Sequence, residues 1–510
     1  MALPLNWASL PWRNQKEVVG ALDLGTTGVR FFLFDLNARP IASGYRELPL
    51  SFPRPGWVEQ DPRGMVEHSL SVIREALEKA GLSPADLLGF GPTNWRETVV
   101  LWEKETGKPL APAIVWQDRR TAERCWALRT SPLAQEIRAK TGLLSDPYFS
   151  ATKLEWLFSR DQKLRRRAEK GEILAGTVDS WLLFALCGVH ATDPTNASRT
   201  LLFHTHDLSW DQSLCELFGI PKSVLPEVQP SLSTFGHTKR ELLGAEIPVA
   251  GVLGDQQAAL FGQGCLTEGE GKVTWGTGAF LLINTGLKPA PPPEGILVTL
   301  AYSRNGEVFY ALEGSAFIAG AAIQWLRDSL GLIKNASETE ELGQSLPENE
   351  GVYFVPAFVG LGAPHWDPYA RGTILGLTRG TTRAHLARAA LEAIAYQTHD
   401  LLRAMEGTVG KKLSELRVDG GAAKNNFLCQ FQADILGIPV VRPAILETTA
   451  LGAALACGVS LGLWDLEDIP NLIQPERRFA PQIPETTREK LLAGWKKAVE
   501  RAKDWAKESE

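Results

Sequence analysis

Two similar strand–turn–strand patterns, about half a chain apart, constrain the fold of this sequence more than any other feature. In residues 18–34 two apolar runs flank Gly25-Thr26-Thr27, and in residues 272–283 two apolar runs flank Gly276-Thr277-Gly278. Glycine lets such a turn approach phosphate oxygens closely, and threonine adds a hydroxyl donor. Either pattern alone would favour a plain hairpin turn. Their repetition predicts two similar domains, each with a phosphate-facing hairpin.

Helical patterns alternate with strand patterns along the rest of the chain. Asp61-Pro62 begins a helix that continues to about Lys79, and Gly81 follows its end. Residues 384–405 form a long amphipathic pattern. Residues 450–464 are nearly all small or apolar, and this run is too short to cross a bilayer, so it indicates a buried helix. The mixture predicts an α/β fold.

The length of the chain favours more than one domain, because 510 residues exceed what one hydrophobic core comfortably holds. The last helical pattern, residues 487–507, is charged and amphipathic, and its Trp495 and Trp505 are expected to point inward. We expect an irregular leader at residues 1–16, an N-terminal domain at 17–264 and a C-terminal domain at 265–510.

Charge and cysteine content exclude several classes of function. The net charge of −6 argues against a nucleic-acid or anionic-membrane surface as the main partner. The six cysteines are scattered without short paired spacings, which argues against a metal cluster or a disulfide framework. This pattern, together with the lack of a secretory signal at the N-terminus, favours a protein of the reducing cytoplasm.

Two polar segments predict a site for a neutral polyhydroxy substrate. Asp255 is a lone carboxylate that follows Gly254 at the start of a helical pattern rich in small residues. Arg96 and Glu97 place a cation directly beside an anion. A carboxylate can accept a proton, and an Arg–Glu pair offers both donors and acceptors to hydroxyl groups.

The first hairpin carries groups that suit a nucleotide–metal complex. Asp23 can hold Mg²⁺ directly or through water, and Arg30 can neutralise phosphate oxygens. The sequence has no Gly-Lys-Ser/Thr phosphate loop and no dinucleotide glycine fingerprint after a strand, so these two nucleotide folds lose support. A strand ending at Asp419 leads through Gly420-Gly421 to a helix that begins near Asn425, and such a helix start can accept polar parts of a ligand.

Longer motifs then connect these features to a known family. The chain resembles the FGGY carbohydrate kinases, and within them the members that act on glycerol, from about Val18 to the C-terminal helix. Residues 148–156 and 360–378 match the two stretches by which this family is usually recognised. Further matching segments, two of which overlap these stretches, are residues 102–109, 113–117, 146–150, 192–200 and 360–364.

This resemblance implies an actin-like architecture of two ribonuclease-H-like domains around a central cleft that holds ATP and substrate. It also implies Mg²⁺ as cofactor and a homo-oligomer, either a dimer or a tetramer. The implied substrate set is Arg96, Glu97, Trp116, Tyr148, Asp255, Gln256 and Phe280. The implied nucleotide set is Thr26, Thr27, Arg30, Thr277, Gly320, Gln324, Gly421 and Asn425. Asp255 carries over as the catalytic residue, and Asp23 and Asp255 are the expected metal ligands.

The expected reaction is the phosphorylation of glycerol to sn-glycerol 3-phosphate. Arg96, Glu97 and Asp255 can bind three hydroxyls, and an indole such as Trp116 can cover the CH face. Asp255 would accept the proton of the hydroxyl that attacks the γ-phosphorus in line. Two alternatives remain: a family kinase for another small polyol or ketose, and an actin-like binding protein that is switched by nucleotide without turnover.

The sequence departs from the family pattern at several positions. Leu24 replaces a usual glutamine, and Gly28-Val29 replace a usual hydroxyl-bearing pair, which affects ATP affinity or nucleotide choice. Trp95 replaces a glutamine before Arg96, so this side chain either lies in the core or reshapes the pocket. Residues 240–246 are shorter than the family's inhibitor-binding loop and carry two glutamates, which would repel fructose 1,6-bisphosphate, so we expect no inhibition by that route.

Overall fold

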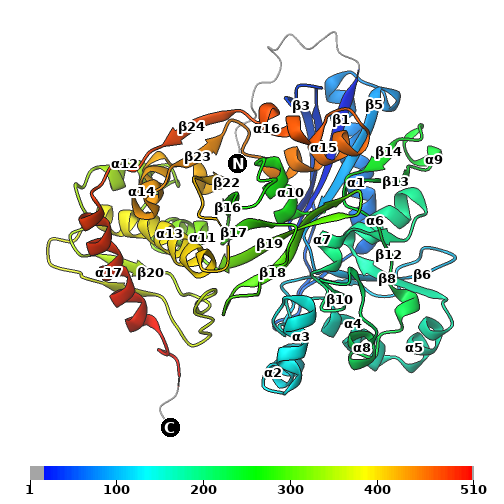
Figure 1. Cartoon of the computed structure of the whole chain (residues 1–510), viewed down its shortest axis with the longest axis horizontal. Coiled ribbons are helices and arrows are strands. Elements are labelled where there is room, and N and C mark those ends of the chain that lie inside the picture. Colours follow the sequence, from blue (N-terminus) through cyan, green and yellow to red (C-terminus); the bar gives the residue numbers. More distant parts are fainter. Residues whose placement is uncertain (1–16, 410, 508–510) are drawn as a thin grey trace. The chain divides into compact units, whose positions relative to one another are not determined.

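The computed structural model describes residues 17–409 and 411–507, and the predicted leader at residues 1–16 lies outside them (Figure 1). The chain forms two compact units. The first unit contains the described residues up to Gly264 together with residues 298–310 and 448–473. The second contains residues 265–297, 311–447 and 474 onward. The fold mixes helices and strands, as the sequence predicts.

The structure differs from the predicted division at one point, because the second domain is not contiguous over residues 265–510. Two of its segments, residues 298–310 and 448–473, belong to the first unit. The helix α15 (Thr448–Ser460) packs against β1 (Val18–Gly25), and Figure 1 shows the two side by side in orange and blue. Nearly all of α15 is buried. Burial of its apolar side chains against the first sheet stabilises this placement.

The first unit is built on a seven-stranded mixed sheet. Strand β1 pairs antiparallel with β2 and parallel with β5, and β5 pairs parallel with β14 and β15. The order is β13-β14-β5-β1-β2-β3, with β15 beside β5. The bounds are β2 (Gly28–Phe34), β3 (Pro40–Glu47), β5 (Leu87–Asn94), β13 (Thr234–His237), β14 (Pro248–Ala250) and β15 (Leu253–Gly254).

The second unit repeats the central part of this arrangement. Strand β16 pairs antiparallel with β17 and parallel with β22, which in turn pairs parallel with β23. The order within this unit is β17-β16-β22-β23-β24. The bounds are β16 (Gly271–Trp275), β17 (Ala279–Gly286), β22 (Leu416–Asp419), β23 (Val440–Pro443) and β24 (Pro475–Phe479). In both units a glycine–threonine hairpin has its first strand parallel to a later strand, as expected for two similar domains.

Helices and short strands surround these sheets. The helices of the first unit are α1 (Pro62–Ala80), α2 (Ala122–Arg129), α3 (Leu133–Thr141), α4 (Ala151–Arg160), α5 (Gln162–Glu169), α6 (Val178–Cys187), α7 (Pro194–Ala197), α8 (Gln212–Leu217), α9 (Arg240–Leu243), α10 (Asp255–Gly262), α15 and α16 (Ile469–Leu472). Its short strands are β4 (Glu59–Gln60), β6 (Val99–Glu103), β7 (Ala113–Ile114), β8 (Ile173–Thr177), β9 (Ala191–Thr192), β10 (Phe203–His204), β11 (Ser209–Trp210) and β12 (Glu227–Val228).

The second unit has α11 (Gly320–Asp328), α12 (Glu338–Gln344), α13 (Arg383–Glu406), α14 (Asn426–Leu436), α17 (Glu485–Ala502) and the strands β20 (Tyr353–Val355) and β21 (Thr373–Leu375). Strands β18 (Leu297–Arg304) and β19 (Glu307–Ala316) have residues in both units. The 3₁₀ turns are η2 (Pro84–Asp86), η3 (Lys222–Val224), η4 (Gly421–Lys424) and η5 (Leu466–Asp468).

The helix boundaries follow local signals in the sequence. The carboxylate of Asp61 caps α1 by accepting from the backbone N–H of Arg63, and Gly81 ends this helix at a φ of 68°. The pattern over residues 384–405 becomes α13. One expectation is wrong: Trp495 is buried in α17, but Trp505 is 72% exposed. Helix α17 ends at Ala502, so the residues beyond it no longer follow the helical face.

No helix among the described residues combines the length and apolar character needed to cross a membrane.

Candidate active site

The predicted Arg–Glu pair lies directly after β5, in the interior of the first unit. Arg96 is 2% exposed and Glu97 is 1% exposed. Arg96 Nε lies 3.2 Å from Asp255 Oδ1 and 3.8 Å from Glu97 Oε1. The buried Arg96 side chain therefore contacts both Asp255, the predicted base, and Glu97, the carboxylate predicted to bind the substrate. The three residues that the sequence singled out lie together.

Parallel strand pairing explains why Asp255 and Arg96 meet. Strand β15 pairs with the end of β5, with Gly254 opposite Asn94, and Asp255 begins α10 at the next position. Chain segments that leave the same edge of a parallel pair emerge side by side. Gly254 is required here, because a Cβ at this position would lie 2.7 Å from Arg96 Cγ and Cδ. The Asp255 side chain itself is 30% exposed, which leaves it accessible to a substrate.

Gln257 is a site residue that sequence reasoning missed. Its buried side chain accepts a hydrogen bond from Arg96 Nη1 at 3.2 Å through Oε1. Its Nε2 donates to Thr299 Oγ1 at 3.0 Å. Gln256, the predicted substrate contact, is only partly buried, and its backbone N–H donates to Asp255 Oδ1 at 2.7 Å. Two adjacent glutamines are indistinguishable in a sequence, and only the helix direction shows which of them contacts Arg96.

The first hairpin brings a second carboxylate toward Asp255. Burial raises the pKa of Asp23 to about 6, against the opposing effect of the Arg30 guanidinium, and repulsion from Asp255 adds to the rise. Asp23 and Asp255 thus interact electrostatically within one unit. Two carboxylates that repel each other suit a divalent cation, because oxygen ligands are what Mg²⁺ prefers and nucleotide phosphates and water can complete its shell. The residues present therefore fit the predicted metal.

Aromatic side chains connect the hairpin turn to the predicted apolar wall of the substrate site. Trp116 Nε1 donates to Thr26 Oγ1 at 3.0 Å, and the Trp116 ring meets the Tyr148 ring edge-on at 5.4 Å between centroids. Thr98 Oγ1 accepts from the backbone N–H of Trp116 at 3.1 Å, which ties this wall to the segment that carries Glu97. Thr27 and Arg30 are exposed at the same hairpin.

The loop that carries Tyr148 is held by a buried lysine. Lys153 Nζ donates to the carbonyls of Pro147, Tyr148 and Phe149 at 2.6, 2.7 and 2.9 Å. Burial lowers the pKa of this ammonium to about 7, and the charge of Glu97 opposes that effect. Because one ammonium group binds three consecutive carbonyls, this loop has little freedom.

The structure explains the departures at the hairpin and before Arg96. Trp95 is 2% exposed and belongs to the hydrophobic core that also contains Leu24 and Val29. Its alternative placement in the pocket is therefore wrong, because the Trp95 side chain lies in this core while the Arg96 side chain contacts Asp255. A Cβ at Gly28 would lie 2.4 Å from the Tyr45 ring, so a side chain at this position would require the half-exposed Tyr45 ring to move.

The other predicted site residues lie in the second unit. Thr277 forms the turn between β16 and β17, and its carbonyl accepts from the backbone N–H of Ala319 at 2.8 Å. Gly320 begins α11, where a Cβ would lie 2.6 Å from the carbonyl oxygen of Gly276. Gln324 is exposed on this helix, and Phe280 is partly buried on β17. The Thr277 turn thus lies beside the start of α11, the helix that carries Gly320 and Gln324.

The glycine pair after β22 adjoins the same turn. Because β16 and β22 are parallel, Gly420 follows β22 beside the end of β16, and a Cβ there would lie 2.5 Å from the carbonyl oxygen of Trp275. Gly421 begins a 3₁₀ turn. Asn425 caps α14 by accepting from the backbone N–H of Leu428 at 2.9 Å, as the sequence predicts.

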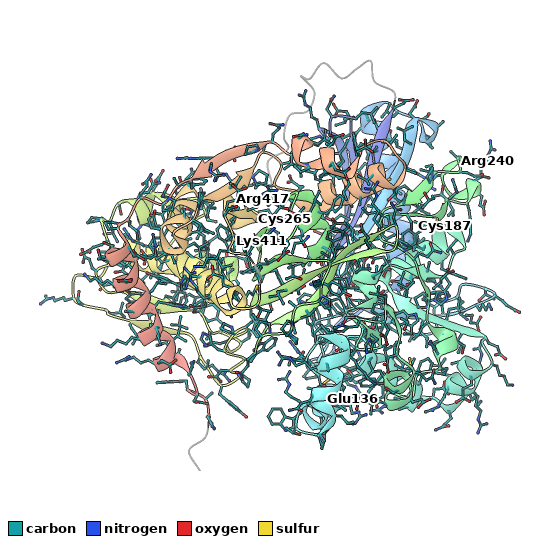
Figure 2. All side chains as sticks on the ribbon, in the orientation of Figure 1. Glu136, Cys187, Arg240, Cys265, Lys411 and Arg417 are labelled. Carbon is teal, nitrogen blue, oxygen red and sulfur yellow. The ribbon has the colours of Figure 1, made fainter. Side chains whose placement is uncertain are left out.

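The segment in place of the inhibitor loop forms the one-turn helix α9. Its Arg240 side chain is exposed and projects from the periphery of the first unit (Figure 2). Gly244 ends the helix at a φ of 83°, and Leu243 anchors it in the core. Within the described residues, no group of three or more His, Cys, Asp or Glu side chains is arranged to hold a metal ion.

The chain is similar to known proteins over most of its length. Residues 18–262 match the N-terminal domain of the FGGY family of carbohydrate kinases, and residues 271–461 match its C-terminal domain. The chain is 56% identical to the glycerol kinase of Thermus brockianus, covering 96% of this chain and 99% of that protein. It is 53% identical to glycerol kinase 2 of Thermotoga maritima, covering 96% of this chain and 100% of that protein.

Solved structures of carbohydrate kinases have a similar fold. The glycerol kinase of Plasmodium falciparum with ADP superposes with a TM-score of 0.90 at 36% identity, covering 95% of this chain and 98% of that chain. A xylulose kinase of Lactobacillus acidophilus, 22% identical, has the same fold with a TM-score of 0.84, covering 95% of this chain and 97% of that chain. The fold is thus the two-domain, actin-like α/β fold that the sequence predicts. The chain belongs to the FGGY family of carbohydrate kinases.

Proposed function

We propose that this protein transfers the γ-phosphate of ATP to glycerol and forms sn-glycerol 3-phosphate. The observation that carries the proposal is the buried cluster in which Arg96 lies 3.2 Å from Asp255 and 3.8 Å from Glu97. The high identity to glycerol kinases over nearly the full chain supports glycerol as the substrate. The core position of Trp95 removes the feature that favoured another polyol or ketose.

The cluster suits a small triol. The Arg96 guanidinium donates and the Glu97 carboxylate accepts, so together they can bind adjacent hydroxyl groups, while Trp116 and Tyr148 offer an aromatic wall to the CH face. Gln256 and Phe280 complete the proposed substrate set. Because Arg96 is fixed by Asp255 and Gln257 before substrate arrives, little ordering remains to oppose binding.

Asp255 is the proposed general base. Its carboxylate would accept the proton of the terminal hydroxyl as that oxygen attacks the γ-phosphorus, and the bond from phosphorus to the ADP oxygen breaks on the opposite side. The exposure of Asp255 leaves room for the hydroxyl. The contact with Arg96 orients the carboxylate. Most of the rate would come from positioning and from groups that offset phosphate charge.

Two sets of residues would hold the nucleotide and its metal. Asp23 and Asp255 would hold Mg²⁺, which when bound offsets the negative charge of the phosphates. The proposed ATP contacts are Thr26, Thr27, Arg30, Thr277, Gly320, Gln324, Gly421 and Asn425.

Two broader expectations belong to this proposal. A cytoplasmic location is supported by the six cysteines, all of which are unpaired. Assembly into a dimer or tetramer is the second, and sedimentation equilibrium of the purified chain tests it directly. A monomer at micromolar concentration would contradict that expectation.

A coupled assay of ADP release across four substrates tests the function. We expect glycerol to give the highest kcat/KM, dihydroxyacetone to follow, and erythritol and xylulose to react poorly. A preference for xylulose would identify a kinase of another sugar. If none of the four substrates leads to ADP release, the result would favour a binding protein that is switched by nucleotide without turnover.

A further inference from the structure

Glu97 occupies an unusual backbone conformation for a residue with a side chain. Its φ is 68°, in the left-handed region, and the N–H of Thr98 donates to the carbonyl of Arg96 at 2.8 Å. This hydrogen bond closes a three-residue turn centred on Glu97. A residue other than glycine in this region is strained, and the strain persists only where the surroundings hold it. The contacts that hold Glu97 therefore determine the conformation of the proposed polyol-binding pair, Arg96 and Glu97.

One contact fixes the backbone of this turn. Ser150 Oγ donates to the carbonyl oxygen of Glu97 at 3.0 Å, and both residues are buried. Ser150 precedes α4 and follows the loop whose carbonyls Lys153 binds. A rigid loop thus presents the hydroxyl that anchors the strained peptide.

A second contact fixes the side chain. Arg199 Nε donates to Glu97 Oε1 at 2.7 Å, and the whole Arg199 side chain is buried. The same guanidinium lies over the rings of Tyr148 and Phe149, with its Cζ atom 5.5 and 5.1 Å from their centroids. Arg199 therefore contacts two residues of the proposed substrate set, by an ion pair to Glu97 and by a cation–π contact to Tyr148.

Hydrogen bonds in the segment that precedes Arg199 fix its position. It follows α7, whose first turn is capped by Asp193, with Oδ1 and Oδ2 accepting from the backbone N–H groups of Asn196 and Thr195. Thr195 Oγ1 in turn accepts from the backbone N–H of Gly254 at 2.8 Å. One short buried segment is thus tied both to the residue that precedes Asp255 and, through Arg199, to Glu97.

Charges of alternating sign complete the arrangement. Asp255, Arg96, Glu97 and Arg199 follow one another at 3.2, 3.8 and 2.7 Å. The closest of the three contacts is the one to Arg199, so Arg199 has the strongest hold on the Glu97 carboxylate. Without it, the attraction of that carboxylate to Arg96 would be less opposed, and the pair would present a separate donor and acceptor less well.

We propose that Arg199 is a positioning residue that sets the affinity for the polyol by holding Glu97 and Tyr148, with Ser150 as its backbone counterpart. The inference rests on the proposed function, because it takes Glu97 and Tyr148 as polyol contacts. Contacts made equally in the ground and transition states change KM and leave kcat nearly constant. Loss of the clamp should therefore appear in the KM for glycerol.

The test compares Arg199→Lys and Ser150→Ala with matched controls. Lysine keeps the charge but lacks the planar donor set of arginine. We expect both variants to raise the KM for glycerol by roughly tenfold, with kcat changed less than about threefold and the KM for ATP unchanged. Arg388→Lys, at another buried Arg–Glu pair, and Ser69→Ala, at another buried hydroxyl that donates to a carbonyl, should leave both KM values unchanged.

A double variant separates positioning from general stability. In a Glu97→Gln background, Arg199→Lys should raise the KM for glycerol by less than it does alone, because the contact to Glu97 is already changed and only the contact to Tyr148 remains to be weakened. Multiplicative effects on KM would show that Arg199 acts independently of Glu97 and would overturn the proposal. So would a KM for glycerol within twofold of the unsubstituted protein in both single variants.

The outcomes distinguish this inference from the proposed function. If the unsubstituted protein releases no ADP with glycerol but does so with another polyol, the proposed function fails. The KM of Arg199→Lys for that polyol, divided by the KM of the unsubstituted protein, then decides the role of Arg199. If no polyol is used, both fail. If Arg199→Lys does not fold, Ser150→Ala decides alone, because a buried hydroxyl is the smaller loss.

Discussion

At the scale of single residues, Asp255 combines accessibility with a fixed orientation, since its side chain is 30% exposed and Arg96 contacts it at 3.2 Å. Asp255→Asn keeps the size of the side chain but removes the proton acceptor. We expect kcat to fall by about 10²-fold or more, as is usual for loss of a general base. Steady-state ADP release measures this effect, with Asp207→Asn at an exposed surface position as the control. Turnover close to that of the control would refute the assignment.

Asp23 predicts a pH dependence of stability. Its pKa in the folded protein is about 6, above the ordinary value of 3.8, so folding favours the protonated acid. That stabilising contribution is complete below about pH 4 and is lost as the pH rises through about 6. Asp23→Asn removes this loss, so it should raise the free energy of unfolding at pH 8 by up to about 3 kcal/mol while weakening activity.

Urea unfolding of the Asp23→Asn variant at pH 4 and pH 8 checks this sign. The two proteins should be nearly equal in stability at pH 4 and diverge at pH 8. A variant that is less stable at pH 8 would show that the ionised carboxylate is compensated in the folded protein.

At the scale of elements, the contact between α10 and α15 depends on glycine. A Cβ at Gly452 would lie 1.8 Å from the carbonyl oxygen of Ala258, and a Cβ at Gly262 would lie 2.0 Å from that of Thr448. Gly452→Ala should therefore separate the two helices and destabilise the protein by roughly 1–3 kcal/mol. Gly64→Ala is the matched control, because this helical glycine meets no atom closer than 3.8 Å. It should instead stabilise, by up to about 1 kcal/mol.

Thermal unfolding of both alanine variants decides between the two effects. An unchanged Tm for Gly452→Ala would mean that the helices can separate without loss of packing. Because α10 begins at Asp255, we also expect this variant to lose activity in proportion to the displacement of the base.

The elements show which parts of the site a sequence can predict. The hairpins, α1, α13 and the start of α14 near Asn425 depend on residues that are adjacent in the sequence, so local sequence patterns predicted them. The contacts of Gln257 and Arg199 with the Arg–Glu pair depend on the parallel pairing of β15 with β5 and on a turn more than a hundred positions from Glu97. Neither contact has a local signature. Trp505 was misjudged because helical periodicity does not reveal where the helix stops.

At the scale of the whole molecule, the first unit is assembled from three separate stretches of chain. A fragment of residues 17–264 lacks residues 298–310 and α15, which covers β1 and β5. We expect this fragment to bind a hydrophobic dye and to unfold without a cooperative transition, because a sheet face rich in apolar side chains stays uncovered. Circular dichroism and dye fluorescence check this. A sharp transition in the fragment would show that the first stretch is a self-sufficient domain.

The place of α15 in the chain also has a consequence for biosynthesis. The sheet that carries the proposed catalytic cluster emerges from the ribosome early, yet the helix that covers it follows about 200 residues later. During that interval the nascent polypeptide exposes an unfinished interior, which invites chaperone binding and makes translation speed between these stretches a determinant of yield.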